Sequence, residues 1–130
     1  METAILAGSS GRARTSGGRR LPYNRGLPTP KKVFSYDEAA LLLPEVRQAT
    51  AQAYLRVQRL AISGAAAQAE TDAVVQSWAQ DLIARGLEIK GLWLVDFDNG
   101  SGYYCWRYPE QRLDFYHSYD EGFGGRMRIQ

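Results

Sequence analysis

Residues 92–126 read LWLVDFDNGSGYYCWRYPEQRLDFYHSYDEGFGGR, and this stretch decides the fold. Its aromatic and β-branched residues fall in short runs separated by turn-forming residues, which predicts β-strands over 92–98, 101–108 and 113–118. A further run of strand-forming residues, 87–90, comes just before them. Because the runs are joined by short links, the sequence predicts an antiparallel β-meander.

Two turns set the predicted register of this meander. Asn99-Gly100 favours a type I′ hairpin, because both central positions of that turn need a positive φ, and a two-residue turn there pairs Asp96 with Tyr103. A four-residue loop over 109–112 then pairs Arg107 with Asp114. One face of the sheet would carry Trp93, Val95, Phe97, Tyr104, Trp106, Tyr108, Leu113, Phe115 and His117. The other face would carry Leu92, Leu94, Asp96, Tyr103, Cys105, Arg107, Asp114, Tyr116 and Ser118. We expect the first face to cover the core, and a one-residue change in either turn would exchange the faces beyond it.

Three helical segments are predicted before the strands. Ser35 and Glu38 form a capping box, so a short helix over 36–42 should follow, with a kink at Pro44. Apolar residues then recur at three- and four-residue spacing, which predicts the main helix over about 44–62. A second helix over about 70–85 completes an antiparallel hairpin. The predicted fold class is α+β, with the helical hairpin on one face of the small meander.

The first 32 residues differ from the rest in composition and charge. They contain seven basic side chains and one acidic one, although the whole chain has a net charge of only +2. Rich in Gly, Ser, Arg and Pro and without periodicity, they are predicted to be a disordered basic tail, so that residues 33–130 form a single domain. A solvated tail, or a start codon placed too far upstream, is favoured over weak nucleic-acid binding by the tail, and an organelle transit peptide ranks last.

Composition limits the class of protein. The chain is 45% hydrophobic and 23% charged, as in ordinary globular domains. No apolar run approaches the roughly 20 residues that span a bilayer, and no signal-peptide core is present. Cys105 is the single cysteine, which excludes an internal disulfide. We therefore expect a cytoplasmic protein that does not bind membranes.

Catalytic chemistry finds little support. His117, the only histidine, could activate the thiol of Cys105, but the predicted register puts the two on opposite faces. Cys105 is therefore interpreted as a small buried hydrophobe, and no catalytic residue is predicted. One His, one Cys and scattered carboxylates lack any paired metal-ligand spacing, so no metal site and no cofactor are expected.

Ligand binding is the better hypothesis for the remaining polar residues. Asp96 lies in mid-strand and needs a partner such as Tyr103 or Arg126. Arg107 is interpreted as a cross-strand partner of Asp114, with an anion clamp as the alternative. The loop 122–126 could turn backbone amides toward an anion, but its favoured interpretation is a return of the chain over the sheet, with Phe123 as its plug. The candidate ligand-binding residues are Asp96, Arg107, His117, Gly122, Gly124, Gly125 and Arg126.

Most of the chain resembles a bacterial family known as domain of unknown function 2203. The resemblance rests on the motifs Phe34-Ser35-Tyr36-Asp37-Glu38-Ala39, Leu42-Leu43-Pro44-Glu45-Val46, Leu94-Val95-Asp96-Phe97, Cys105-Trp106-Arg107, His117, Gly122-Phe123 and Gly125-Arg126. It covers about residues 33–129. Tyr116 and Pro109 depart from the pattern, which has Trp before the histidine and a Gly-containing turn. The resemblance implies a small cytosolic bacterial protein with no assigned activity.

The leading hypothesis for function is a non-catalytic interaction or binding module. The alternative is a small-anion or metabolite site, enzymatic or not, built from Asp96, Arg107, His117 and Arg126. A homodimer through the open face of the sheet is the leading partner hypothesis. That face would present Leu92, Leu94, Tyr103, Cys105 and Tyr116.

Overall fold

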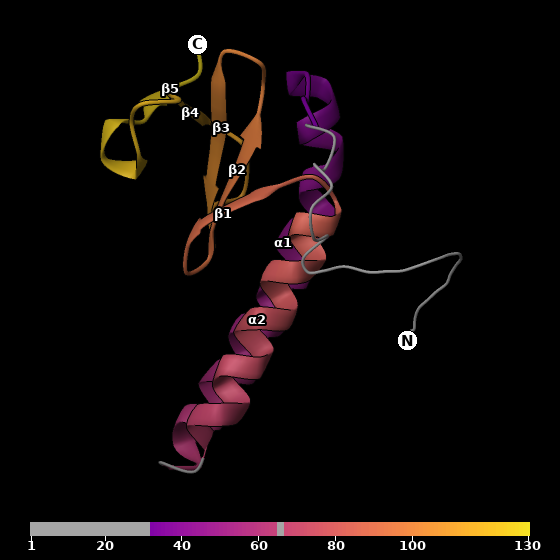
Figure 1. Cartoon of the computed structure of the whole chain (residues 1–130), viewed down its shortest axis with the longest axis vertical. Coiled ribbons are helices and arrows are strands. Elements are labelled where there is room, and N and C mark those ends of the chain that lie inside the picture. The colour runs from indigo at the N-terminus through magenta and orange to yellow at the C-terminus, as the bar shows by residue number, and fades with distance from the viewer. Residues whose placement is uncertain (1–31, 65–66) are drawn as a thin grey trace, which may run out of the picture. The chain divides into compact units, whose positions relative to one another are not determined.

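The computed structural model describes residues 32–64 and 67–130 as an α+β unit (Figure 1). Residues 1–31 lie outside the described part, and so does the prediction of a disordered basic tail. The elements are α1 (Tyr36–Ile62), α2 (Gln68–Ala84), β1 (Glu88–Gly91), β2 (Leu94–Asp98), β3 (Gly102–Arg107), β4 (Phe115–Ser118), the short 3₁₀ helix η2 (Phe123–Gly125) and β5 (Met127–Arg128). The strands form one antiparallel sheet in the order β1-β2-β3-β4-β5, which confirms the α+β meander. None of the helices in the described residues is both long enough and apolar enough to cross a bilayer.

Helix α1 begins at the predicted cap. The Ser35 hydroxyl accepts from the Glu38 amide at 3.1 Å, and the Ser35 amide donates to the Glu38 carboxylate at 2.9 Å. The prediction of a separate short helix over 36–42 is wrong, because α1 continues past Pro44 to Ile62. Pro44 removes one backbone donor, while the residues around it, Leu43 and Val46, are both buried and hold the helix against the core.

The two helices form the predicted antiparallel hairpin. Near its middle, Trp78 of α2 donates from its indole nitrogen to the hydroxyl of Thr50 at 2.8 Å, and Thr50 in turn donates to the Val46 carbonyl at 2.7 Å. Nearer the sheet, Arg85 and Glu45 form an ion pair at 2.7 Å. The two contacts show that α1 and α2 run antiparallel, as can also be seen in Figure 1.

One face of the sheet joins the helices in a single apolar core. Val95, Phe97 and Trp106 have no exposed surface, and Phe97 meets Phe34 edge-on at 5.5 Å. From the helices the core takes Ala39, Leu43, Val46, Ala53, Trp78 and Leu82, and from the connections Phe34, Leu87, Trp93 and Leu113. The predicted placement of Val95, Phe97 and Trp106 on the core face is confirmed.

The first hairpin turn is wider than predicted. Asp98 pairs with Tyr103 and Asp96 with Cys105, so the predicted pairing of Asp96 with Tyr103 is wrong by two residues. The side chains of Asp98 and Asn99 explain the wider turn, because they accept from the amides of Gly100 and Ser101 at 2.8 Å each. A shift of two residues leaves each side chain of β2 and β3 on its predicted face.

The second turn differs by one residue, and this exchanges the faces of β4. Tyr103 pairs with His117 and Cys105 with Phe115, so His117 and Phe115 lie on the face opposite to the one predicted. In the connection the Glu110 amide donates to the Arg107 carbonyl at 2.8 Å and the Trp106 indole donates to the Glu110 carbonyl at 2.8 Å, so a turn begins at Arg107 and Tyr108 does not pair with Leu113. The predicted pair of Arg107 with Asp114 is also wrong, because the pairing of β3 with β4 stops at Cys105 and Phe115, and the Asp114 carboxylate lies near Arg112 and Arg128 instead.

The predicted open, apolar sheet face therefore has a different composition. Cys105 and Tyr103 are only 1% and 9% exposed, and the register moves Tyr116 to the other face. Leu92 remains exposed at 56%. Beyond β4 the chain continues through η2 and β5, which the sequence did not predict, and Tyr116 pairs with Met127 of β5.

Candidate functional site

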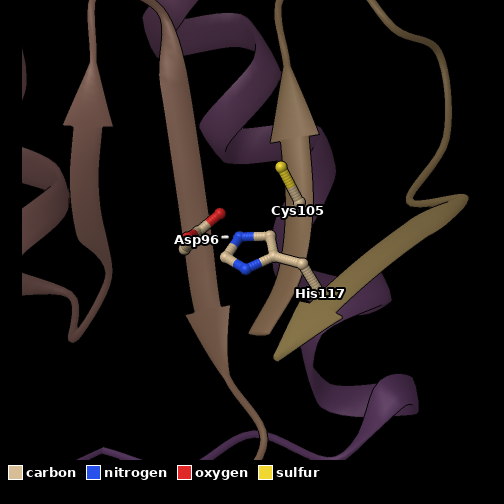
Figure 2. Close-up of side chains that lie close together, drawn as sticks. All are labelled: Asp96, Cys105 and His117. Atoms are coloured by element: carbon tan, nitrogen blue, oxygen red, sulfur yellow. Dashed lines mark hydrogen bonds and ion pairs between the residues drawn. The ribbon is translucent and has the colours of Figure 1, made fainter. Parts of the chain in front are cut away.

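Three strands bring one carboxylate, one thiol and one imidazole together on the face of the sheet that points away from the helices. Asp96 of β2 stands opposite Cys105 of β3, and His117 of β4 stands opposite Tyr103, two residues before Cys105 on the same face (Figure 2). One ligand atom from each of Asp96, Cys105 and His117 lies within 4.8 Å of the other two. All three side chains are buried. We call them the polar cluster.

The imidazole of His117 is held at both nitrogens. Nδ1 lies 2.8 Å from the carbonyl oxygen of Ser118, and because a carbonyl can only accept, Nδ1 carries a proton and donates it. Nε2 lies 2.9 Å from Oδ2 of Asp96. A second proton must lie between these two atoms, either on the imidazole or on the carboxyl group. The ring is therefore fixed in one orientation, with Nε2 facing the polar cluster.

This contact satisfies only one of the two carboxylate oxygens of Asp96. Its other oxygen, Oδ1, is fully buried and has no hydrogen-bond partner in the described part of the chain. Burial raises the pKa of the Asp96 carboxyl, and the nearby His117 and Cys105 oppose that shift. A buried carboxylate oxygen without a partner is uncommon in folded proteins and points to a group that it could bind.

Cys105 is held as a neutral thiol. Burial and then the charge of Asp96 raise the pKa of the thiol to about 12, although the nearby Arg126 opposes the shift. The thiol is also only 1% exposed. Because the thiolate is the reactive form, Cys105 is a poor nucleophile in this state, despite lying beside an imidazole.

Arg126 forms a cover next to the polar cluster. Its guanidinium lies 3.9 Å from the ring centre of Phe115 and 4.2 Å from that of Phe123. Both of its terminal nitrogens bond to the carboxylate of Glu110, one of them at 3.1 Å. This fork is therefore occupied by a carboxylate of its own chain, and the side chain of Arg126 is only 14% exposed.

The other predicted site residues lie outside the polar cluster. Arg107 is exposed, with its guanidinium 5.4 Å from the ring of Phe123. The predicted anion loop is a 3₁₀ turn in which the amides of Gly125 and Arg126 donate to the carbonyls of Gly122 and Phe123. Gly122 and Gly124 are exposed. The amides of Gly125 and Arg126 therefore bond within the loop and do not point to a shared anion.

Of the predicted site residues, the structure brings Asp96 and His117 into direct contact and places Arg126 beside them. The sequence predicts Cys105 as a packing residue, because the predicted register puts it on the face opposite His117, whereas the observed register brings it into this site. No spacing in the sequence pointed to it, because Cys105 comes beside His117 only when β3 and β4 pair one residue away from the predicted register. Glu110 carried no signal, since its role depends on the shape of the loop.

Comparison with known proteins gives a family and no activity. A family model described as "Uncharacterized conserved protein (DUF2203)" matches residues 56–129, which is more than half of the chain and includes every strand and the polar cluster. The motifs within residues 34–46 lie before the matched region. No curated protein and no solved structure matches the chain. The chain belongs to the family of uncharacterised conserved proteins DUF2203, as its motifs led us to expect.

Proposed function

We propose that the chain is a non-catalytic interaction module and that the outer face of α1 is its binding surface. Leu41, Leu55 and Ile62 are 79%, 51% and 87% exposed. They lie fourteen and seven residues apart, so they follow one side of the helix, away from the buried residues of α1. We call these three residues the outer stripe. Large aliphatic side chains exposed along a helix favour contact with another helix.

The charges beside the outer stripe favour a second copy of this chain as the partner. The first turn of α1 carries Asp37 and Glu38, whereas Arg56 and Arg59 lie near its other end. Two α1 helices packed antiparallel would place the acidic end of each against the basic end of the other. With the two-fold axis at Gln48, Leu41 of one copy meets Leu55 of the other.

The proposal that the module is non-catalytic rests on the polar cluster. Nucleophilic catalysis needs a thiolate that a substrate can reach, whereas the Cys105 thiol is buried and its pKa is raised to about 12. Both nitrogens of His117 are engaged, so the imidazole is not free to take a proton from a substrate. The most reactive side chains are thus separated from solvent, which supports a binding function over a catalytic one.

Sedimentation velocity of the full chain at tens of micromolar tests the proposal. We expect a dimer, and we expect Leu55→Glu to give a monomer because it puts carboxylates at two points of the interface. Leu92→Glu is the matched control, since Leu92 is equally exposed at 56% but lies outside the outer stripe, and this variant should remain dimeric. A monomeric natural chain, or equal dissociation of both variants, would overturn the proposal.

A small-anion site remains the second candidate because of Arg107. Its guanidinium is exposed and has no carboxylate partner among the residues that the structure describes, whereas Arg126 is occupied by Glu110. A phosphorylated or carboxylated metabolite that bound there would raise the melting temperature of the natural chain. The Arg107→Gln variant should lose that rise. A metabolite panel that leaves the melting temperature unmoved excludes this candidate.

Nucleic-acid binding by the basic tail is a separate proposal that rests on composition alone. It predicts a salt-sensitive retardation of RNA or DNA in gels, because released counterions make such binding weaken as salt rises. Deleting residues 1–32 should abolish the retardation. Equal binding by the shortened chain would show that the tail is not responsible.

A further inference from the structure

We infer that Asp96, Cys105 and His117 form a binding site for one divalent transition-metal ion, with zinc as the best fit. This inference is independent of the outer stripe, since it concerns the opposite side of the sheet from the helices. Its basis is the polar cluster itself, in which a carboxylate oxygen, a thiol sulfur and an imidazole nitrogen lie within 4.8 Å of one another (Figure 2).

The donor types select the class of ion. Calcium and magnesium prefer six or more oxygen ligands, whereas a set of sulfur, nitrogen and oxygen suits zinc and its neighbours in the first transition row. Zinc lies about 2.3 Å from sulfur and about 2.0–2.2 Å from nitrogen or oxygen. Binding would draw the three donors in to those distances around one ion, from 2.9 Å between Nε2 of His117 and Oδ2 of Asp96 and from within 4.8 Å for the whole set.

The unpartnered oxygen of Asp96 is an independent sign of a missing ligand. Oδ1 is fully buried, and the described residues offer it no hydrogen bond. A carboxylate that binds an ion through both oxygens would use Oδ1 as the fourth donor. Together with Nε2 of His117 and the sulfur of Cys105, it would give the four-coordination that zinc favours.

The orientation of His117 also matches that of a metal ligand. Histidines that bind metals usually donate their other ring N–H to a carboxylate or a backbone carbonyl, which fixes the tautomer and aims the free lone pair at the ion. Nδ1 of His117 donates to the Ser118 carbonyl at 2.8 Å, and Nε2 faces the polar cluster. The supporting hydrogen bond is therefore already in place.

Charge balance favours a divalent ion. In the bound state Cys105 is a thiolate, Asp96 a carboxylate and His117 neutral, so a charge of +2 neutralises the site. Binding releases two protons to solvent, one from the thiol and one from between His117 and Asp96. The neighbouring Arg126 adds no unpaired charge, because its guanidinium is paired with Glu110.

An ion bound there would join β2, β3 and β4 through side chains. It would not need a substrate-facing position, which agrees with the burial of all three ligands. The role that follows is structural, in that the metal would hold the end of the meander together and raise the melting temperature of the whole domain.

Cobalt uptake by the full chain is the direct test, because cobalt–thiolate bonds give a charge-transfer absorption that other ligands lack. The chain is unfolded in urea with a chelating resin, then refolded with Co²⁺ and separately with Zn²⁺, so that burial of the site does not block entry. We expect one ion per chain, thiolate-to-cobalt absorption, displacement of cobalt by zinc, and a higher melting temperature with either ion.

Four variants locate the ion. Cys105→Ser should lose the charge-transfer absorption, and Asp96→Asn and His117→Gln should each weaken affinity by more than about tenfold. Asp96→Asn is the sharpest of these, because its amide can still donate to Nε2 of His117 and so preserve the fold. The matched control is Asp114→Asn, which removes a carboxylate near the surface and should bind as the natural chain does.

Two results would overturn the inference. One is a refolded natural chain that takes up no stoichiometric Co²⁺ or Zn²⁺, with the fold verified by circular dichroism. The other is a Cys105→Ser variant that keeps both the affinity and the absorption of the natural chain, since the ion would then lie elsewhere. Binding that is lost equally in Asp114→Asn and Asp96→Asn would also place the ion outside the polar cluster.

Discussion

Asp96 and Phe97 are consecutive residues of β2, and both have no exposed surface, yet they lie in opposite environments. Phe97 points toward the helices and meets Phe34 edge-on. Asp96 points to the other face, where Oδ2 bonds to His117 and Oδ1 has no partner among the described residues. The sheet therefore has two buried faces, one apolar and one polar.

The two faces of the sheet are stabilised by different interactions. Burial of apolar surface is non-directional, so the helix side tolerates small shifts as long as volume is conserved. Burial of a polar group is favourable only where a partner stands in the right place, so the polar face needs the register of three strands to be correct. Loss of buried apolar area should therefore destabilise the apolar face, whereas loss of a hydrogen-bond partner should destabilise the polar face.

The largest effect is expected on the apolar face. Phe97→Ala removes a fully buried ring between the sheet and Phe34, and we expect the free energy of unfolding to fall by about 3–5 kcal/mol. Urea denaturation followed by circular dichroism measures it. Phe97→Leu, which keeps most of the volume, should cost far less. Equal losses in the two variants would show that this face is not held by buried area.

A smaller effect is expected on the polar face. Asp96→Ala leaves Nε2 of His117 buried without a partner, which should lower the free energy of unfolding by about 1–3 kcal/mol. Asp96→Asn should recover much of this loss, because its amide donates to the same nitrogen. Denaturation in the presence of a chelator keeps metal out of the measurement. A more stable Asp96→Ala variant would mean that the free energy needed to bury the carboxyl is larger than the stabilisation from its hydrogen bond.

The same contrast explains what the sequence could predict. The apolar face follows from alternation along each strand, and a two-residue error in the first turn left Phe97 and Trp106 on their predicted side. The polar cluster needed the second turn to be correct within one residue, and that turn depends on contacts that spacing does not encode, such as the bond from the Trp106 indole to the Glu110 carbonyl. Spacing alone could not have joined Cys105 to His117, because the residues of the polar cluster lie on three different strands.

The smallest effect on stability is expected at the cover of the polar face. Arg126→Met keeps a long side chain between Phe115 and Phe123 but removes the charge and the pair with Glu110, so we expect a loss of about 1 kcal/mol. Its effect on Cys105 should be easier to see. Loss of the guanidinium also removes a charge that lowers the pKa of the thiol, so any gain in reactivity must come from access. A looser cover admits water and the alkylating reagent, so native-state alkylation of this cysteine should become faster.

Alkylation is read by mass spectrometry at neutral pH, and each chain has one cysteine to report. Arg128→Met is the matched control, because Arg128 also lies over Phe115, at 4.9 Å, but its side chain is 64% exposed. Faster alkylation in Arg126→Met alone would show that the stacked arginine seals the polar face. Equal alkylation rates in both variants and the natural chain would show that the strands themselves exclude water. The polar face would then stay closed without Arg126, as the apolar face does.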